Sequence, residues 1–173
     1  RSELVQAGFR FHSRSDTEVL LNLYLRDGEA MLSRLNGIFA IALWDRTKQR
    51  LLLCRDPLGV KPLLYARRAG RIAFGSEAKA IFASGLVKPE TDLASLHLSM
   101  NLRYIPGTGT MFRGIRRLPP GHLAIVAQDV EGQVGPIGGT GPGLSNEAPA
   151  YHDIGPDIAL VAQEIFVDLG LVV

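Results

Sequence analysis

Residues 37–55 read GIFAIALWDRTKQRLLLCR, two apolar runs on either side of a short polar segment. The runs at 37–45 and 50–55 are rich in aliphatic and aromatic residues, and the four polar residues between them are typical of a hairpin loop. A strand with one solvent-exposed face alternates apolar and polar residues, so these nearly unbroken runs predict strands buried on both faces. The sheet that they form must therefore lie between two other layers.

The neighbouring sequence supplies elements for those layers. Strand patterns occur at residues 63–66, 71–75 and 122–126. Helix start and stop signals predict helices at about residues 15–26, 77–83 and 92–100. No strand leads into a G-x-G-x-x-G segment, which argues against a dinucleotide-binding fold. We therefore expect an α+β domain with antiparallel sheets and flanking helices over residues 1–126.

Two of these helices have recognisable N-termini. Ser15 and Glu18 have the spacing of a capping box, in which Ser15 accepts a hydrogen bond from the amide of Glu18 and Glu18 returns one to the amide of Ser15. Ser76 is the predicted N-cap of the helix that begins at Glu77.

The composition excludes several classes of protein. The chain of 173 residues has the size of one ordinary domain, with 46% hydrophobic and 21% charged residues. It has no apolar run long enough to span a membrane, and no signal peptide is visible at Arg1. Its single cysteine, Cys54, cannot form an internal disulfide, and the four histidines have no metal-binding spacing. We expect a cytoplasmic protein without a metal site or a membrane partner.

Charge divides the chain into two parts. All 19 Lys and Arg residues and ten of the 17 Asp and Glu residues lie in residues 1–126, a net charge of +9, whereas residues 127–173 hold seven acidic residues and no basic one. The basic residues are scattered rather than arranged in a stripe, so we expect no nucleic-acid partner. They are better explained by a surface that faces an acidic partner domain.

Residues 127–173 differ from the first part of the chain in composition as well. Residues 132–143 contain six Gly and two Pro, a composition typical of a linker or mobile loop, and we assign residues 127–149 to a linker. Residues 150–173 resume a helical pattern, with apolar residues at 158, 161, 165 and 169. This segment is interpreted as the helical start of a second, truncated domain.

Five blocks of the chain, in order, resemble the second part of the glutaminase domain of glutamine-hydrolysing asparagine synthetases. The blocks are FHSRSDTEVLLNLY (11–24), RLNGIFAIALWD (34–45), CRDPLGVKPLLYA (54–66), IAFGSEAKAI (72–81) and LRYIPGTGTMFRGIRRLPPGH (102–122). The resemblance implies that residues 1–126 are part of a class II glutamine amidotransferase domain and that residues 150–173 are the helical start of a truncated synthetase domain. The fold of the amidotransferase domain is an N-terminal-nucleophile-type sandwich of two antiparallel sheets with flanking helices, here incomplete because its N-terminal part is missing.

The resemblance also implies a two-step chemistry. In the family, an N-terminal cysteine attacks the side-chain amide of glutamine, with its own α-amino group as the base and an Asn-Gly segment as the oxyanion hole. These groups and an arginine that contacts glutamine are expected upstream of residue 1, so we expect no catalytic residue in this chain and no activity from this fragment alone. The released ammonia would reach the protein's own C-terminal synthetase domain, which uses ATP and magnesium to amidate aspartate. No cofactor is expected in this fragment. A homodimer is a further possibility that the resemblance leaves open.

Few residues of the site itself are expected here. The resemblance implies that Asp16 binds the α-ammonium group of glutamine; the alternative is that Asp16 only complements the helix dipole. Arg55, Lys61 and Glu77 are interpreted as a structural charge network or, alternatively, as groups that shape the route by which ammonia leaves. Cys54 lies in an apolar strand pattern and is expected to be an inert, buried thiol.

Two other functions remain open. One is a related amidotransferase that uses another acyl acceptor, because the acceptor is chosen by the synthetase domain. The other is a non-catalytic glutaminase-like module that serves in binding or assembly.

Overall fold

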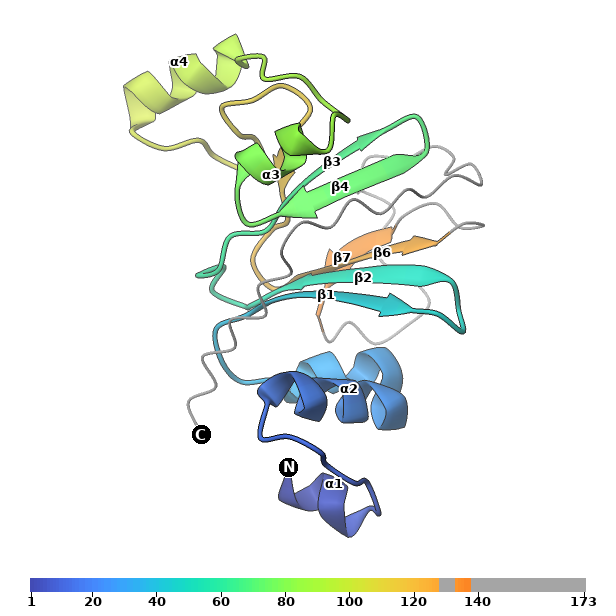
Figure 1. Cartoon of the computed structure of the whole chain (residues 1–173). Helices are drawn as coiled ribbons and strands as arrows, with labels where there is room; N and C mark the ends of the chain where they lie inside the picture. Colours follow the sequence, from blue (N-terminus) through green and yellow to red (C-terminus); the bar gives the residue numbers. More distant parts are fainter. Residues whose placement is uncertain (128–132, 138–173) are drawn as a thin grey trace.

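The structure is a computed structural model that describes residues 1–127 and 133–137 (Figure 1). Its larger sheet contains β1 (Ala40–Asp45), β2 (Arg50–Arg55), β6 (His122–Ala127) and β7 (Gln133–Pro136). The strands are antiparallel and follow the order β1-β2-β6-β7. The predicted hairpin at 37–55 and the predicted strand at 122–126 are confirmed.

The smaller sheet contains β3 (Leu64–Arg68), β4 (Arg71–Gly75) and the short β5 (Arg116–Arg117), in the order β4-β3-β5. The β3–β4 hairpin turns through only two residues, Ala69 and Gly70, which have φ angles of 48° and 73°. Positive φ at both central residues is the signature of a type I′ turn, whose twist matches that of the flanking strands. The strand patterns predicted at 63–66 and 71–75 leave four residues between them. The turn in the structure is shorter than this, because Arg67 and Arg68 belong to β3.

Helices cover the outer faces of both sheets (Figure 1). The larger sheet is covered by α2 (Asp16–Asp27) and by the 3₁₀ helix η1 (Gly28–Arg34), while α3 (Ala78–Ala83) packs on β3 and β4. The short α1 (Ser2–Gln6) and α4 (Leu93–Leu102) lie at opposite ends of the molecule. This arrangement confirms the α+β class and the two antiparallel sheets.

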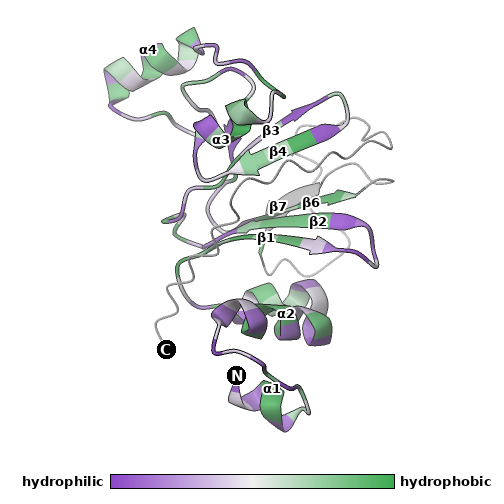
Figure 2. Cartoon of the chain, in the orientation of Figure 1, coloured by the Kyte–Doolittle hydropathy of each residue, from purple (hydrophilic) through white to green (hydrophobic). Residues whose placement is uncertain are grey.

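The core is divided by β2. Leu52 and Cys54 belong to a buried cluster with residues of α2 and η1, whereas Leu51 and Leu53 belong to a second buried cluster with Leu63 and other residues of the smaller sheet. The apolar parts of the strands therefore lie between the layers (Figure 2). The prediction that this strand is buried on both faces is confirmed.

The predicted capping box at the start of α2 is wrong in its partners. Ser15 Oγ accepts a hydrogen bond from the amide of Thr17 at 3.1 Å. The Glu18 carboxylate instead accepts hydrogen bonds from the amides of His12 and Ser13, each at 2.7 Å, and from the Ser13 hydroxyl. The chain before the helix folds back over the first turn, so these N–H groups reach Glu18 while the amide of Ser15 donates to Ser13 Oγ.

Two further helix starts can be compared with prediction. Glu77, not Ser76, is the N-cap of α3, and its side chain makes no capping hydrogen bond. Asp92, the predicted first residue of the next helix, is instead the N-cap of α4, and its carboxylate accepts from the amide of Ser95 at 2.8 Å. The helix that follows extends to Leu102, two residues beyond the predicted end.

Strand β7 lies within residues 127–149, which were assigned to a linker, and the Gly/Pro-rich pattern did not predict it. Pairing with the open edge of β6 needs only extended backbone, which this composition allows. The predicted helical segment at 150–173 and the rest of the linker lie outside the described residues. Within the described part, no helix is long and apolar enough to cross a membrane.

The chain passes from the larger to the smaller sheet through residues 56–61, here called the Asp56 loop. The Asp56 side chain is fully buried, and its carboxylate accepts hydrogen bonds from the amides of Leu58, Val60 and Lys61 at 3.0–3.1 Å. Burial raises the pKa of Asp56, but these backbone hydrogen bonds outweigh burial and hold it below its ordinary value. One buried carboxylate thus fixes the loop backbone.

Arg55 holds the same loop from its other side. Its guanidinium donates to the carbonyl oxygens of Lys61, Gly59 and Leu118 at 2.7, 2.6 and 2.8 Å. Through Leu118 it also joins the loop to the Pro119-Pro120-Gly121 turn before β6. Arg55 and Asp56 therefore both bond to backbone groups of these two turns.

Replacing Asp56 by Ala should lower the free energy of unfolding by about 3 kcal/mol, because three backbone N–H groups would lose the fully buried carboxylate that accepts their hydrogen bonds. Urea denaturation of the variant measures this loss. The matched control is Glu90→Ala, which removes an exposed ion pair with Arg113 and should change stability by less than about 0.5 kcal/mol. Equal effects of the two substitutions would contradict the role assigned to Asp56.

Glu18 should titrate far below an ordinary carboxyl group. Hydrogen bonds from the amide of His12 and from the Ser13 hydroxyl lower its pKa from 4.5 to about 2. Because the pKa is lower in the folded state, Glu18 stabilises the loop above pH 4.5, and this stabilisation is lost as the pH falls towards 2. The NMR shift of the Ser13 amide should follow this titration and lose it in Glu18→Gln. A midpoint near 4.5 would show that the contacts do not persist in solution.

Candidate functional site

A cavity of about 380 Å³ lies at the N-terminal end of α2. Its walls come from α1, the first turns of α2, Arg34 at the end of η1, and the segment Leu35–Phe39 that leads into β1. This volume falls within the range of small-molecule sites. The cavity is therefore placed where one helix begins and the larger sheet starts.

Asp16, the first residue of α2, is half-buried and lines this cavity. Its Oδ1 accepts a hydrogen bond from the amide of Thr17 at 2.9 Å. Among the described residues, no Lys, Arg or His forms an ion pair with Asp16. The cavity thus presents a carboxylate that has no counter-ion of its own, which suits a cationic ligand group.

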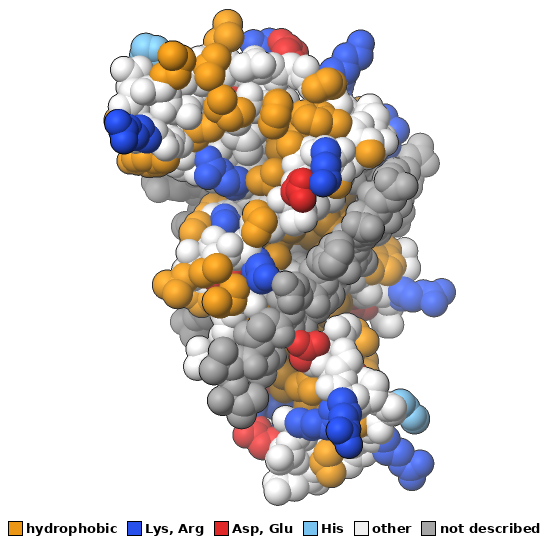
Figure 3. Space-filling view, turned by 60° about the vertical axis from the view of Figure 1, so that its left-hand side comes forward, with side chains coloured by type: hydrophobic (Ala, Val, Ile, Leu, Met, Phe, Trp, Pro, Cys, Tyr) orange, Lys and Arg blue, Asp and Glu red, His pale blue; other side chains and the backbone are white. Residues whose placement is uncertain are grey.

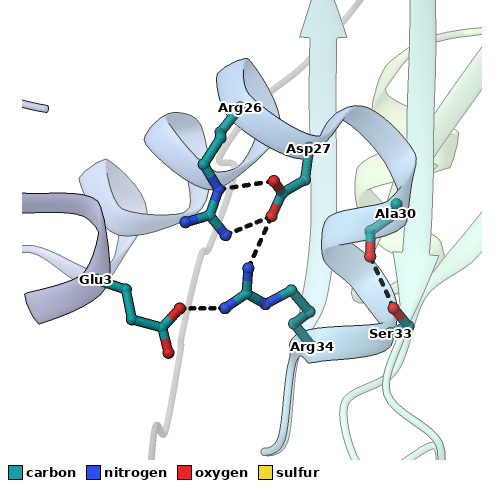
Figure 4. A network of polar contacts seen from close by, with 6 residues as sticks. All are labelled: Glu3, Arg26, Asp27, Ala30, Ser33 and Arg34. Carbon is teal, nitrogen blue, oxygen red and sulfur yellow. Dashed lines mark hydrogen bonds and ion pairs between the residues drawn. The ribbon is translucent and has the colours of Figure 1, made fainter. Parts of the chain in front are cut away.

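The basic residue Arg34 also lines the cavity but is already paired (Figure 4). Its guanidinium bonds to Glu3 of α1 and to Asp27 of α2, the latter at 3.2 Å. Asp27 in turn accepts two hydrogen bonds from Arg26, at 2.6 and 2.7 Å. This network joins α1, α2 and η1 around the cavity, so Arg34 serves to hold its walls together.

Asn36 and Gly37 line the cavity as well, followed by Ile38 and Phe39. These residues were not predicted to be part of the site. An Asn-Gly pair directly before an apolar strand was the available signal, but an Asn-Gly segment was expected only upstream of residue 1. Phe39 further connects the cavity to the Asp56 loop, because its carbonyl accepts a hydrogen bond from the amide of Asp56 at 2.9 Å.

Cys54 lies on β2 with almost no exposed surface, between Ile41 and Leu123 on the neighbouring strands. Burial raises the pKa of its thiol to about 12. At neutral pH such a thiol stays protonated, whereas the thiolate is the nucleophile. The structure therefore agrees with the expectation of a buried strand thiol.

Arg55 is the last residue of β2, and its guanidinium donates to the carbonyl of Lys61 at the end of the Asp56 loop. Glu77 is elsewhere, at the start of α3, and its ion pair is formed with Lys79, at 2.9 Å and largely exposed. Burial lowers the pKa of the Arg55 guanidinium. The expected network thus brings Arg55 and Lys61 together through the backbone and does not include Glu77. No group of three or more potential metal ligands occurs in the described part of the chain.

A family model and several similar proteins agree on the type of domain that this chain resembles. The family model described as "Glutamine amidotransferase domain" matches residues 1–133. "Asparagine synthetase [glutamine-hydrolyzing] 3" of Bacillus subtilis is 41% identical over 131 residues, which are 75% of this chain and 21% of that protein. A "Putative asparagine synthetase [glutamine-hydrolyzing]" of Mycobacterium tuberculosis is 38% identical over 143 residues, 79% of this chain and 21% of that protein.

A fungal relative has a different name. "Amidase chry2" of Gibberella zeae is 34% identical over 117 residues, which are 68% of this chain and 17% of that protein. The chain spans only about a fifth of the length of the curated relatives that it matches. The family match itself covers most of the described residues, including the cavity and the Asp56 loop. This chain therefore belongs to the glutamine amidotransferase domain family.

Proposed function

We propose that this chain forms part of the glutamine-hydrolysing domain of an asparagine synthetase and binds glutamine in the cavity at the start of α2. The domain supplies ammonia for the ATP-dependent amidation of aspartate by another domain of the same cytoplasmic protein. The observation that carries this proposal is the Asp16 carboxylate, which forms no ion pair with any residue that the structure describes, in a cavity of about 380 Å³ of a chain matched by this family. Glutamine carries an α-ammonium group that fits such a carboxylate.

Asp16 acts by positioning the substrate. Its carboxylate accepts charge-assisted hydrogen bonds from the α-ammonium group, which are shorter and stronger than neutral ones. Fixing one end of glutamine orients the side-chain amide towards the attacking group, and such orientation contributes much of the rate of a two-component reaction. The network of Arg34, Glu3 and Asp27 keeps the walls in place while the ligand binds.

The nucleophile comes from outside this chain. The family resemblance implies an N-terminal cysteine whose α-amino group is the base, and Cys54 has neither a free amine nor an accessible thiol. In the described part, β1 forms an edge of the larger sheet. An open edge can take up a further strand, which supports an N-terminal-nucleophile-type sandwich completed by the rest of the polypeptide.

ATP and magnesium belong to the domain that activates the acceptor, and we assign no residue of this chain to them. That domain also chooses the acceptor. The second candidate is an amidotransferase that transfers ammonia to another acyl group. Relatives named amidases show that similarity to this chain is not confined to proteins named asparagine synthetases. A non-catalytic binding module is the third reading of the same domain.

One assay separates these functions. The full-length protein, supplied with glutamine, ATP, magnesium and aspartate, should form asparagine and glutamate. Glutamate without asparagine would favour another acceptor. No glutamine hydrolysis at all would contradict the proposal and leave the binding module.

Replacing Asp16 by Asn in the full-length protein should raise the KM for glutamine by about tenfold or more, the effect of losing roughly 1.4 kcal/mol of a charge-assisted contact. The KM for free ammonia should stay unchanged, because ammonia bypasses glutamine binding. The matched control is Glu90→Gln, which changes an exposed carboxylate that is paired with Arg113 and does not line the cavity. An equal loss with both nitrogen sources would assign Asp16 to stability.

The purified 173-residue chain should release no ammonia from glutamine, because its one cysteine is buried with a pKa of about 12. A coupled glutamate assay measures this, with Cys54→Ala as the control. Turnover that disappears in Cys54→Ala would place the nucleophile in this chain and refute the assignment.

A further inference from the structure

The segment before α2, residues 11–15 and here called the Ser13 loop, leads directly into the candidate site. Residues 12–15 are all exposed, and the loop contributes no residue to the buried core clusters of the described part. It belongs to the α1 end of the molecule, the lower end in Figure 3, where basic side chains gather on the surface. Because apolar packing does not fix this loop, its conformation depends on hydrogen bonds.

Glu18 accepts most of these hydrogen bonds. Its carboxylate accepts from the amides of His12 and Ser13 and from the Ser13 hydroxyl, each at 2.7 Å. Arg1 holds Ser13 from the other side, because its guanidinium donates to the Ser13 carbonyl at 2.6 Å. The amide, the hydroxyl and the carbonyl of Ser13 are therefore all bonded, two of them to Glu18.

The hydroxyl of Ser13 connects Glu18 to the start of α2. An ionised carboxylate only accepts hydrogen bonds, so the hydroxyl proton points to Glu18 and its oxygen accepts from the amide of Ser15 at 3.1 Å. Ser15 is the N-cap of α2, and its own hydroxyl oxygen accepts from the amide of Thr17 at 3.1 Å. The N-cap is thus held on one side by Glu18 through Ser13 and on the other side by the helix.

Asp16 lies between these two contacts. Its Oδ1 accepts from the same Thr17 amide at 2.9 Å, while its Oδ2 forms no hydrogen bond with a residue that the structure describes. Residues two apart in an α-helix lie about 200° apart around its axis, and Glu18 does not line the cavity. Glu18 therefore affects the candidate site through the position of Asp16 and not by contact with the ligand.

We propose that Glu18 is a positioning residue for glutamine binding, which fixes the Ser13 loop so that Asp16 Oδ2 faces the α-ammonium group. This inference rests on the proposed function, because it assumes that Asp16 binds glutamine. Without the Glu18 carboxylate the loop loses three hydrogen bonds, and the Ser13 hydroxyl no longer has a fixed orientation towards Ser15. Asp16 would then be held in its binding orientation only part of the time.

The first test measures the kinetics of the full-length protein. Glu18→Ala should leave Asp16 correctly oriented in about a fifth of the molecules, so the KM for glutamine should rise about fivefold. The kcat should change far less, because glutamine binds the correctly oriented form, and the KM for ammonia should stay the same. A lower kcat with an unchanged KM for glutamine would assign Glu18 to stability and overturn the proposal.

Two variants control this measurement. Glu18→Gln keeps one acceptor oxygen, so its KM for glutamine should lie between those of Glu18→Ala and the unchanged protein. Glu90→Ala removes an exposed ion pair with Arg113 and should leave the KM for glutamine unchanged.

A double-mutant cycle shows whether Glu18 acts through Asp16. In a protein that already carries Asp16→Asn, adding Glu18→Ala should raise the KM for glutamine by less than about twofold, because the carboxylate that Glu18 positions is gone. A further rise of about fivefold would show that the two residues act independently, and it would overturn the proposal.

Hydrogen–deuterium exchange tests the positioning role without any turnover. In the full-length protein, peptides that cover residues 11–17 should exchange about tenfold faster in Glu18→Ala than in the unchanged protein, and no faster in Glu90→Ala. Equal exchange in all three proteins would overturn the proposal. Faster exchange in a protein that hydrolyses no glutamine would refute the proposed function and leave Glu18 as the residue that fixes Asp16.

Discussion

Strand β2 has no face exposed to solvent, because Leu52 and Cys54 pack beneath α2 while Leu51 and Leu53 pack against the smaller sheet. Burying a large apolar side chain contributes roughly 1.5–3 kcal/mol, so this strand is stable only between two layers. The helices α2 and η1 supply one layer and the β3–β4 hairpin supplies the other. Every other feature of the domain is positioned relative to this buried strand, including the cavity in front of β1.

The end of β2 then creates the second constraint. Beyond Arg55 the chain must leave the larger sheet and enter the smaller one, and the backbone N–H groups of the connecting loop turn towards the fully buried carboxylate of Asp56. Asp56 accepts three of these hydrogen bonds, and Arg55 donates to the carbonyls that remain nearby. Arg55, which the sequence suggested as a member of a charge network, therefore bonds to backbone carbonyls. The amide of Asp56 also donates to the carbonyl of Phe39. Because Phe39 and Asp16 line the same cavity, this hydrogen bond connects the loop to the wall of the candidate site.

Local patterns predicted the elements, whereas contacts between distant segments escaped prediction. Residues close in sequence determine the apolar runs of β1 and β2 and the N-cap of α2 at Ser15. These elements could therefore be predicted from local patterns. Glu18 has partners six residues away because the preceding loop folds back, and no spacing rule describes that path. Strand β7 was missed because edge pairing uses backbone groups common to all sequences. In the site, Asp16 was predicted by family resemblance, while Asn36 and Gly37 required knowledge of which segments meet around the cavity.

The glutaminase role proposed for this domain depends on Asp16 holding glutamine in the cavity at the start of α2. A crystal structure of the full-length protein with a glutamine analogue bound covalently to the nucleophile tests it most directly. We predict the α-ammonium nitrogen of the analogue within about 3 Å of an Asp16 carboxylate oxygen, the distance of a charge-assisted hydrogen bond. An analogue held elsewhere, with Asp16 bonded only to the amide of Thr17, would contradict the proposal that Asp16 binds the α-ammonium group of glutamine.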